Sequence, residues 1–215
     1  MEEDVGLTLG VDEAGRGAQL GPLVLGAVVL STAQAAQLVS AGLNDSKPLT
    51  AARRRQLGAA IRSTATWVDV EISPAHVVDR YVAGGGRRRT TLNVLEQKMA
   101  RSLIQRAPAC TRLVADGRTL FRPLERQNQN LRAIDHADQT EPAVMAAAIV
   151  AKLERDRLLA EIERACVSLC GFIPRRGYPG LETTAWLARY ERFFGEPPDA
   201  ARLTWGRGYL HRSKH

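Results

Sequence analysis

Two neighbouring carboxylates, Asp12 and Glu13, stand between two hydrophobic segments near the start of the chain. Residues 5–9 before them alternate like the end of a strand, and Leu23–Leu30 is an almost unbroken apolar run that predicts another strand. Carboxylates between two such strands lie close to the body of a protein, where burying an uncompensated negative charge is costly. The pair therefore predicts a compensating cation, and a divalent metal is the natural candidate.

The glycines that follow decide whether both carboxylates can serve one site. Neighbouring side chains of a regular strand point to opposite faces, so the backbone has to leave the strand at about Glu13. Gly15 and Gly17 permit such a bend, and Arg16 between them can bring a positive charge to the same place. The alternative is an exposed Asp-Glu turn followed by a flexible Gly-Arg-Gly linker, and spacing alone does not decide between the two.

Composition narrows the class of protein. The 215 residues are 45% hydrophobic, which is sufficient for the core of one domain, and the net charge of +7 comes mostly from arginine. A basic globular protein suits a polyanionic partner, either nucleic acid or an anionic membrane surface. No apolar run approaches the roughly 20 residues that span a bilayer. We therefore expect a soluble protein.

The cysteines and the N-terminus bear on the compartment. The three cysteines, Cys110, Cys166 and Cys170, are scattered and odd in number, which favours reduced thiols over a disulfide framework. Cys166 and Cys170 can share one side of a helix, but no second pair completes a zinc site, so we interpret them as core thiols. The chain begins with acidic residues where a signal peptide would be basic. These features predict a cytoplasmic location.

Strands and helices alternate along the rest of the chain. We expect helices over residues 32–41, 50–62, 74–83, 90–106 and 141–165, and strands over 65–72, 112–115 and 131–134. The first half of the last helix, residues 143–151, is small and apolar all round, as in a helix buried tightly against a sheet. The pattern predicts an α/β fold, with a mixed sheet flanked by helices.

Further carboxylates recur where the later strands end. Asp116 closes one strand, and Asp135 and Asp138 follow the next. Strand ends near the middle of an open α/β sheet can converge on one site. Four acidic groups so placed fit a two-metal centre for in-line attack on a phosphodiester. Taken alone, Asp116 and the glycine after it are more typical of a plain turn.

The motifs together resemble the ribonuclease HII family. They comprise the run from Gly10 to Gly17 with Gly21-Pro22, then Asn44-Asp45-Ser46-Lys47, Ala115-Asp116-Gly117, and Ala137-Asp138 at a fixed distance before Ala151-Lys152. The resemblance covers the chain from about Leu7 to its end. It implies a ribonuclease H-like catalytic domain over residues 1–168 and a small C-terminal helical substrate-binding extension over residues 169–215.

The resemblance also implies an activity. The expected protein is an endonuclease that hydrolyses the RNA strand of RNA–DNA hybrids and cuts at single ribonucleotides embedded in duplex DNA, leaving 5′-phosphate and 3′-hydroxyl ends. By the same resemblance Asp12, Glu13, Asp116 and Asp138 hold Mg²⁺ or Mn²⁺ and are the catalytic residues. Asp138 is preferred to Asp135 because its distance to Lys152 agrees with the family.

Substrate contacts follow from the resemblance as well. The backbone of Gly15, Arg16 and Gly17 would read the ribose 2′-hydroxyl, the group that distinguishes RNA from DNA. Tyr178 matches a tyrosine that stacks on the next deoxyribose, and the less favoured alternative is a surface tyrosine in a turn. Asn44, Ser46 and Lys47 match a segment that grips the nucleic-acid backbone, and such contacts position a duplex without reading its sequence.

The chain departs from the family pattern at several positions. Ala18 stands where the family usually has proline, Ala148 where it often has serine, and Pro179 follows Tyr178 where glycine is usual. Pro179 stiffens the chain and removes an amide donor beside the tyrosine. None of the three is a metal ligand, so we expect catalysis to survive.

Several expectations stay open at this point. The chain end, residues 210–215, is basic and lacks an apolar-aromatic sliding-clamp motif, and we expect a monomer. His136 could tune the site, but an exposed loop histidine is the simpler interpretation. Two rival functions remain: a nucleic-acid-binding protein of the same fold that has lost catalysis, and a different nuclease or strand-transfer enzyme on that fold.

Overall fold

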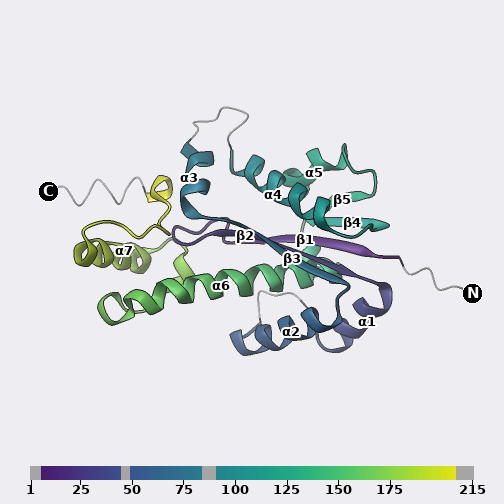
Figure 1. Cartoon of the computed structure of the whole chain (residues 1–215), viewed down its shortest axis with the longest axis horizontal. Helices are drawn as coiled ribbons and strands as arrows, with labels where there is room; N and C mark the ends of the chain where they lie inside the picture. The colour runs from purple at the N-terminus through teal and green to yellow at the C-terminus, as the bar shows by residue number, and fades with distance from the viewer. Residues whose placement is uncertain (1–5, 45–48, 84–90, 207–215) are drawn as a thin grey trace, which may run out of the picture. The chain divides into compact units, whose positions relative to one another are not determined.

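The computed structural model describes residues 6–44, 49–83 and 91–206. Its elements in chain order are β1 (Thr8–Ala14), β2 (Leu23–Leu30), α1 (Thr32–Ser40), α2 (Ala51–Thr64), β3 (Trp67–Ser73), α3 (Ala75–Ala83), α4 (Leu92–Arg106), β4 (Arg112–Asp116), α5 (Arg118–Glu125), β5 (Leu131–Ile134), the 3-10 turn η1 (Ala137–Gln139), α6 (Pro142–Cys170), η2 (Pro174–Gly177), α7 (Leu181–Phe194) and η3 (Leu203–Gly206) (Figure 1).

The chain forms two compact units that are interleaved in sequence. The first contains Met1–Ala14, Val24–Glu71 and Glu96–Leu153, and the second contains Gly15–Leu23, Ile72–Leu95 and Glu154–His215. Three elements, β3, α4 and α6, begin in one unit and end in the other. The division into residues 1–168 and 169–215 stays a prediction, and α6 runs through residue 168 without a break.

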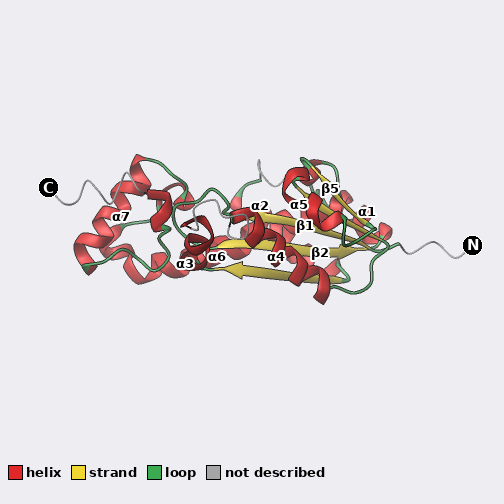
Figure 2. Cartoon of the chain, turned by 90° about the horizontal axis from the view of Figure 1, so that it is seen from above, coloured by secondary structure: helices red, strands yellow, loops and turns green. Residues whose placement is uncertain are grey.

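The first unit is built on a mixed five-stranded sheet in the order β3-β2-β1-β4-β5. β1 pairs antiparallel with β2 and parallel with β4, and β4 pairs parallel with β5. The expected mixed α/β sheet flanked by helices is therefore confirmed. β1 and β2 lie side by side in both views (Figure 1, Figure 2).

One face of the sheet packs against α1, α2 and the first half of α6. Side chains of these helices join those of β2 and β3 in one core, which includes Val28, Leu38, Ile61, Ile149 and Val150. Successive residues of β3 point to opposite faces: Val68 and Val70 pack against this core, whereas Asp69 and Glu71 bind Arg106 of α4 at 2.7 Å. α4 and α5 lie over the opposite face (Figure 1).

α6 approaches the sheet closely because two strand residues have no side chain. A Cβ atom on Gly10 would lie 2.1 Å from the carbonyl carbon of Ala143, and one on Gly26 would lie 2.4 Å from the carbonyl oxygen of Ala147. Alanines on the helix meet glycines on the strands, so backbone packs on backbone. The predicted tight burial of residues 143–151 is confirmed.

The second unit is mostly helical and has its own core. The second half of α6, α7 and the chain after it bury Leu159, Cys166, Cys170 and Trp186 together. The interpretation of Cys166 and Cys170 as core thiols is confirmed, since both are free and buried. None of the helices in the described part of the chain combines the length and apolar character that a bilayer crossing requires.

Candidate active site

The parallel strands bring the carboxylates of the first unit to one edge of the sheet. Val11 of β1 lies beside Ala115 of β4, and Asp116 lies beside Ile134 of β5. Asp12 and Asp116 are therefore the next residues on adjacent parallel strands. The carboxyl ends of such strands form a common edge, which is where sites collect in open α/β sheets.

The alternation of the strands aims Asp12 at the face that carries α6. Gly10 abuts Ala143 of α6, and Asp12, two residues further on, shares that face. Its neighbour across the antiparallel pair is Gly26, which also abuts α6. Asp12 is consequently only 7% exposed, although it is a carboxylate.

The predicted departure of the backbone from the strand at Glu13 is wrong. β1 continues through Ala14, with Glu13 paired to Leu25 and Ala14 to Val24 of β2. The strand can continue because β2 supplies a partner for every residue up to Ala14. The chain turns at Gly15 instead, where φ is +88°.

Asp12, Glu13 and Asp116 nevertheless interact. The pKa of Asp12 is raised well above its usual value, chiefly by burial and then by the negative charges of Glu13 and Asp116. A hydrogen bond from the Glu13 backbone N–H to Asp12 Oδ1, at 2.7 Å, acts in the opposite direction and is outweighed. The fold thus holds three carboxylates together against their mutual repulsion.

Asp138 is tied to the same edge through the backbone beside it. The N–H of Ala137 donates to Asp116 Oδ1 at 2.6 Å, and Asp138 is the next residue. Asp138 lies within η1 and is 3% exposed. One hydrogen bond therefore links the last carboxylate of β4 to the turn that carries Asp138.

Asp135 and His136 have different surroundings. Asp135 is exposed, and its Oδ1 accepts a 2.7 Å hydrogen bond from the backbone N–H of Arg118, so it caps the start of α5. His136 is also exposed and adopts a left-handed backbone with φ of +59°. The buried position of Asp138 favours it over Asp135 as a member of the carboxylate group.

The donor set fits a hard divalent cation. Among residues 6–44, 49–83 and 91–206, no three His, Cys, Asp or Glu side chains already stand as a formed metal cage. Carboxylate oxygens are nevertheless the ligands that Mg²⁺ and similar ions prefer. The pKa of Asp12 is raised first by burial and then by the repulsion of Glu13 and Asp116, and a cation would offset both, so the residues present suit such an ion.

The segment Gly15–Leu23 in the second unit begins with a tight turn. Ala18 N–H donates to the carbonyl of Gly15 at 3.2 Å, a bond that the proline usual in the family could not make. The guanidinium of Arg16 donates to Asn93 Oδ1 at 2.6 Å. Gly17 is open, and an added Cβ there would meet nothing within 4 Å.

A buried arginine of α6 holds this segment. Arg155 is fully buried, and its Nη2 donates to the carbonyls of Leu20 at 2.9 Å and Arg176 at 3.0 Å. Its Nε donates to the carbonyl of Pro22 at 3.3 Å. Burial lowers the pKa of Arg155 from its usual value. A Cβ on Gly15 would lie 2.2 Å from Arg155 Nε, so the turn wraps closely around the guanidinium.

Arg202, which follows α7 in the sequence, is a second buried arginine that holds the segment Gly15–Leu23. It is 1% exposed and donates to the carbonyls of Gly21 at 3.0 Å and Arg16 at 3.1 Å. Sequence reasoning missed both arginines. For Arg155 a signal was present, because it lies four residues from Ala151 and from Leu159 on the buried side of α6.

The turn before Tyr178 is joined to the same segment. The carbonyl of Gly177 accepts hydrogen bonds from Gln19 N–H at 2.8 Å and Leu20 N–H at 3.0 Å. The guanidinium of Arg155 lies 5.1 Å from the centre of the Tyr178 ring. The fold of the second unit therefore brings the predicted ribose-reading turn and the predicted stacking tyrosine onto one arginine.

The third predicted substrate segment is described only in part. Asn44 follows α1 and is exposed, whereas Ser46 and Lys47 lie outside the described residues. The roles proposed for these three residues stay predictions.

Comparison with known proteins decides the family. The family model for ribonuclease HII matches residues 9–207 of the chain. The chain belongs to the ribonuclease HII family. A ribonuclease HII of Chloroflexus aurantiacus is 36% identical over 182 residues, which is 84% of this chain and 80% of that protein. As a family member the chain is a metal-dependent ribonuclease with ribonuclease H activity on RNA–DNA hybrids.

Solved structures agree with this placement. The crystal structure of ribonuclease H2 from Pyrococcus horikoshii OT3 superposes with a TM-score of 0.82 and 27% identity, over 97% of this chain and all of that chain. The ribonuclease HII of Archaeoglobus fulgidus, solved in complex with PCNA, superposes with a TM-score of 0.77 and 27% identity, over 93% and 95% of the two chains. That complex with PCNA does not fit the absence of a sliding-clamp motif inferred from the sequence, and residues 210–215, on which that inference rests, lie outside the described residues.

Proposed function

We propose that this ribonuclease cleaves at single ribonucleotides embedded in duplex DNA as well as in hybrid tracts, by a two-metal mechanism that leaves 5′-phosphate and 3′-hydroxyl ends. Asp12, Glu13, Asp116 and Asp138 would hold Mg²⁺ or Mn²⁺. The observation that carries the proposal is the group of carboxylates held together despite the raised pKa of Asp12. Bound there, the metal supplies activation of water and stabilisation of the departing 3′-oxygen.

The residues of the chain itself supply position and selectivity. Asp116, whose carboxylate accepts the Ala137 N–H, keeps a fixed orientation before any metal arrives. The backbone of Gly15, Arg16 and Gly17 would contact the ribose 2′-hydroxyl, and the openness at Gly17 supports close approach of a sugar. The ribose-reading turn starts directly after β1, within three residues of Asp12 in sequence.

Tyr178 would stack on the deoxyribose that follows the ribonucleotide. Its backbone carbonyl accepts a hydrogen bond from Thr183 Oγ1 at 2.7 Å, and Arg155 approaches its ring. Asn44, Ser46 and Lys47 would grip the backbone of the duplex without reading its sequence.

The proposal is tested by cleavage of three duplexes of equal length in Mg²⁺ and in Mn²⁺. One contains a single ribonucleotide in DNA, one is an RNA–DNA hybrid and one is all DNA. We expect the first two to be cut and the third to remain intact, with Asp12→Asn and Asp138→Asn inactive on all. Equal cleavage of the all-DNA duplex would point to a different nuclease, and tight binding without cutting in either metal would point to a binding protein.

A further inference from the structure

A basic surface covers the exposed side of α5, and no role has yet been assigned to it. Arg118, Arg122 and Arg126 follow one another at four-residue spacing and so share one side of the helix. All three are exposed, and together with Thr119 and Pro123 they line a hollow of about 420 Å³. These five residues are called the α5 surface below.

The arginines of the α5 surface are not neutralised. In the described part of the chain, none of their three guanidinium groups forms a hydrogen bond or an ion pair, and only the backbone N–H of Arg118 is engaged. The one acidic residue of the helix, Glu125, points its carboxylate to the backbone N–H of Ala133 at 2.8 Å. The helix therefore presents three uncompensated positive charges.

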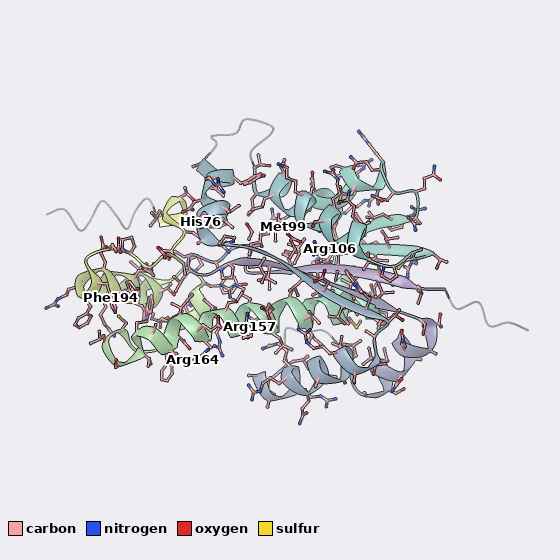
Figure 3. All side chains as sticks on the ribbon, viewed as in Figure 1. His76, Met99, Arg106, Arg157, Arg164 and Phe194 are labelled. Carbon is pink, nitrogen blue, oxygen red and sulfur yellow. The ribbon has the colours of Figure 1, made fainter. Side chains whose placement is uncertain are left out.

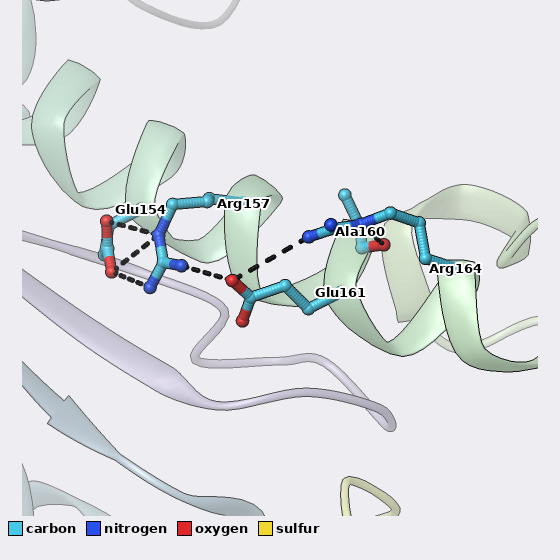
Figure 4. A network of polar contacts seen from close by, with 5 residues as sticks. All are labelled: Glu154, Arg157, Ala160, Glu161 and Arg164. Atoms are coloured by element: carbon cyan, nitrogen blue, oxygen red, sulfur yellow. Dashed lines mark hydrogen bonds and ion pairs between the residues drawn. The ribbon is translucent and has the colours of Figure 1, made fainter.

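Several exposed arginines elsewhere in the fold are paired with carboxylates. Arg106 of α4 binds Asp69 and Glu71 at 2.7 Å, and Arg112 binds Glu141 at 2.6 Å. Arg106 is marked in Figure 3, as are Arg157 and Arg164 on α6. Figure 4 shows Arg157 between Glu154 and Glu161, with Arg164 also directed to Glu161. These exposed arginines thus have acidic partners, whereas in the described part of the chain the three arginines of the α5 surface have none.

The helix that carries them is firmly held. Its opposite side buries Leu120, Phe121 and Leu124, and Gln97 donates to the carbonyl of Leu120 at 2.8 Å. Asp135 caps its first turn through Arg118 N–H. The three guanidinium groups therefore project from an anchored helix rather than from a loop. Less conformational entropy is then lost by the protein when a ligand binds.

We propose that the α5 surface binds the phosphate backbone of the nucleic-acid substrate, beyond the scissile position. Four residues of helix advance about 6 Å, so the three arginines extend over about 12 Å. At about 3.4 Å of rise per nucleotide, this length matches three to four nucleotides of one strand. Guanidinium groups bind phosphate oxygens in a two-point geometry.

Nucleic acid is the occupant because of where the helix begins. Arg118 lies two residues after Asp116, the carboxylate at the end of β4 that belongs to the proposed metal site. A strand with its phosphodiester at that edge brings further phosphates with it, whereas an acidic protein or a lipid surface does not. The inference rests on the proposed function, since it assumes a polynucleotide at the carboxylates. Its contacts are sequence-independent.

The test compares Arg122→Gln/Arg126→Gln with Arg157→Gln/Arg164→Gln, which removes the same charge from paired arginines of α6. Binding to a non-cleaved hybrid is measured at several salt concentrations, together with steady-state cleavage. We expect the logarithmic salt slope of the α5 variant to be shallower by about 2, because each lost phosphate contact removes about 0.9. KM should rise with kcat nearly unchanged, while the α6 variant follows the wild type.

Conservative variants and wild-type behaviour separate the outcomes. Arg122→Lys/Arg126→Lys keeps the charge and should keep the salt slope, which excludes misfolding as the cause of any loss. Wild-type cleavage with an unchanged slope in the Gln variant would overturn this inference alone. Wild-type protein that neither binds nor cuts hybrids would overturn the proposed function as well. If the Gln variant lost only binding to phosphatidylserine vesicles, the surface would belong to lipid and the inference would be wrong.

Discussion

The carboxylate edge of the first unit and the turn after β1 in the second unit use charge in opposite ways. At the edge, Asp12, Glu13 and Asp116 are held together by strand register against their own repulsion. In the turn, the buried cations Arg155 and Arg202 donate hydrogen bonds to the backbone carbonyls of Gly15–Leu23. The first region brings like charges together at the proposed metal site, and the second uses charge to set the shape of a loop. Each can be broken without the other.

The largest effect is expected from Asp138→Asn, which removes one negative charge from the edge. We expect kcat to fall by about 10³-fold or more, or about 4 kcal/mol in the barrier, because the neutral amide holds a divalent ion poorly. Asp135→Asn is the matched control and should stay within about threefold of wild type. The measurement is single-turnover cleavage in Mg²⁺, together with Mn²⁺ titration by calorimetry. Equal losses in the two variants would show that the choice of Asp138 is wrong.

Arg155→Lys is expected to destabilise the segment Gly15–Leu23 without changing the carboxylate edge of the sheet. Lysine has no planar fork and cannot reach the carbonyls of Leu20, Pro22 and Arg176 together, so buried acceptors lose their donors. We expect a loss of about 2–4 kcal/mol, or roughly 5–15 °C in Tm.

The control for this loss is Arg157→Lys, on the same helix but exposed, which should leave the Tm close to that of the wild type. Mn²⁺ affinity should not change in either variant. A Tm for Arg155→Lys that matches this control would contradict the role of the buried arginine.

Asp12→Asn separates stability from catalysis at the edge. The folded pKa of Asp12 lies above its unfolded value, so its contribution to stability is complete below the unfolded pKa and is lost as pH rises through the folded pKa. Without metal, the neutral variant should therefore be more stable than wild type at pH near 7, by about 1–2 kcal/mol, and inactive.

This linkage is measured by thermal melts in EDTA across the acidic to neutral range. The difference in Tm between variant and wild type should widen as pH rises, and it should close when Mg²⁺ is added to the wild type. A gap that is independent of pH would contradict the burial of a charged Asp12.

The smallest effect is expected at Asp135, which caps the first turn of α5. Asp135→Ala removes the acceptor for Arg118 N–H and should cost about 1 kcal/mol, whereas Asp135→Asn keeps an oxygen and should cost a few tenths. Urea unfolding resolves the difference. Comparable losses in the two variants would mean that the cap does not depend on the side-chain oxygen.

Much of the fold was predictable because its elements follow simple periodicity. The strand bounds Leu23–Leu30 and Leu131–Ile134 are confirmed, and Thr50 caps α2 by accepting the Arg53 N–H at 3.2 Å. α5 was missed. It has only eight residues, follows a glycine and contains Pro123, so turn signals masked the apolar positions of Leu120 and Leu124.

The residues of the candidate site also differ in how far the sequence could predict them. Residues that sit at strand ends, such as Asp12 and Asp116, could be found from sequence because strand periodicity fixes their place. Arg202 could not, because an arginine that binds backbone carbonyls leaves no partner residue to recognise in the sequence. For Arg155 the only signal was its position on the buried side of α6, which indicates burial but not what the side chain binds. The sequence also did not show that β1 continues past Glu13, because the extension of the strand to Ala14 depends on pairing with β2.

The bonds between the segment after β1 and residues 200–201 have a consequence for synthesis. Leu20 bridges to Ala201, and Gly21 N–H donates to the carbonyl of Ala200 at 2.8 Å. These partners leave the ribosome roughly 180 residues later, which at about 5–20 residues per second is a delay of roughly 10–40 s. The nascent chain can pair β1 with β2 early, but the segment after β1 acquires its final hydrogen bonds only after residues 200–202 have been synthesised.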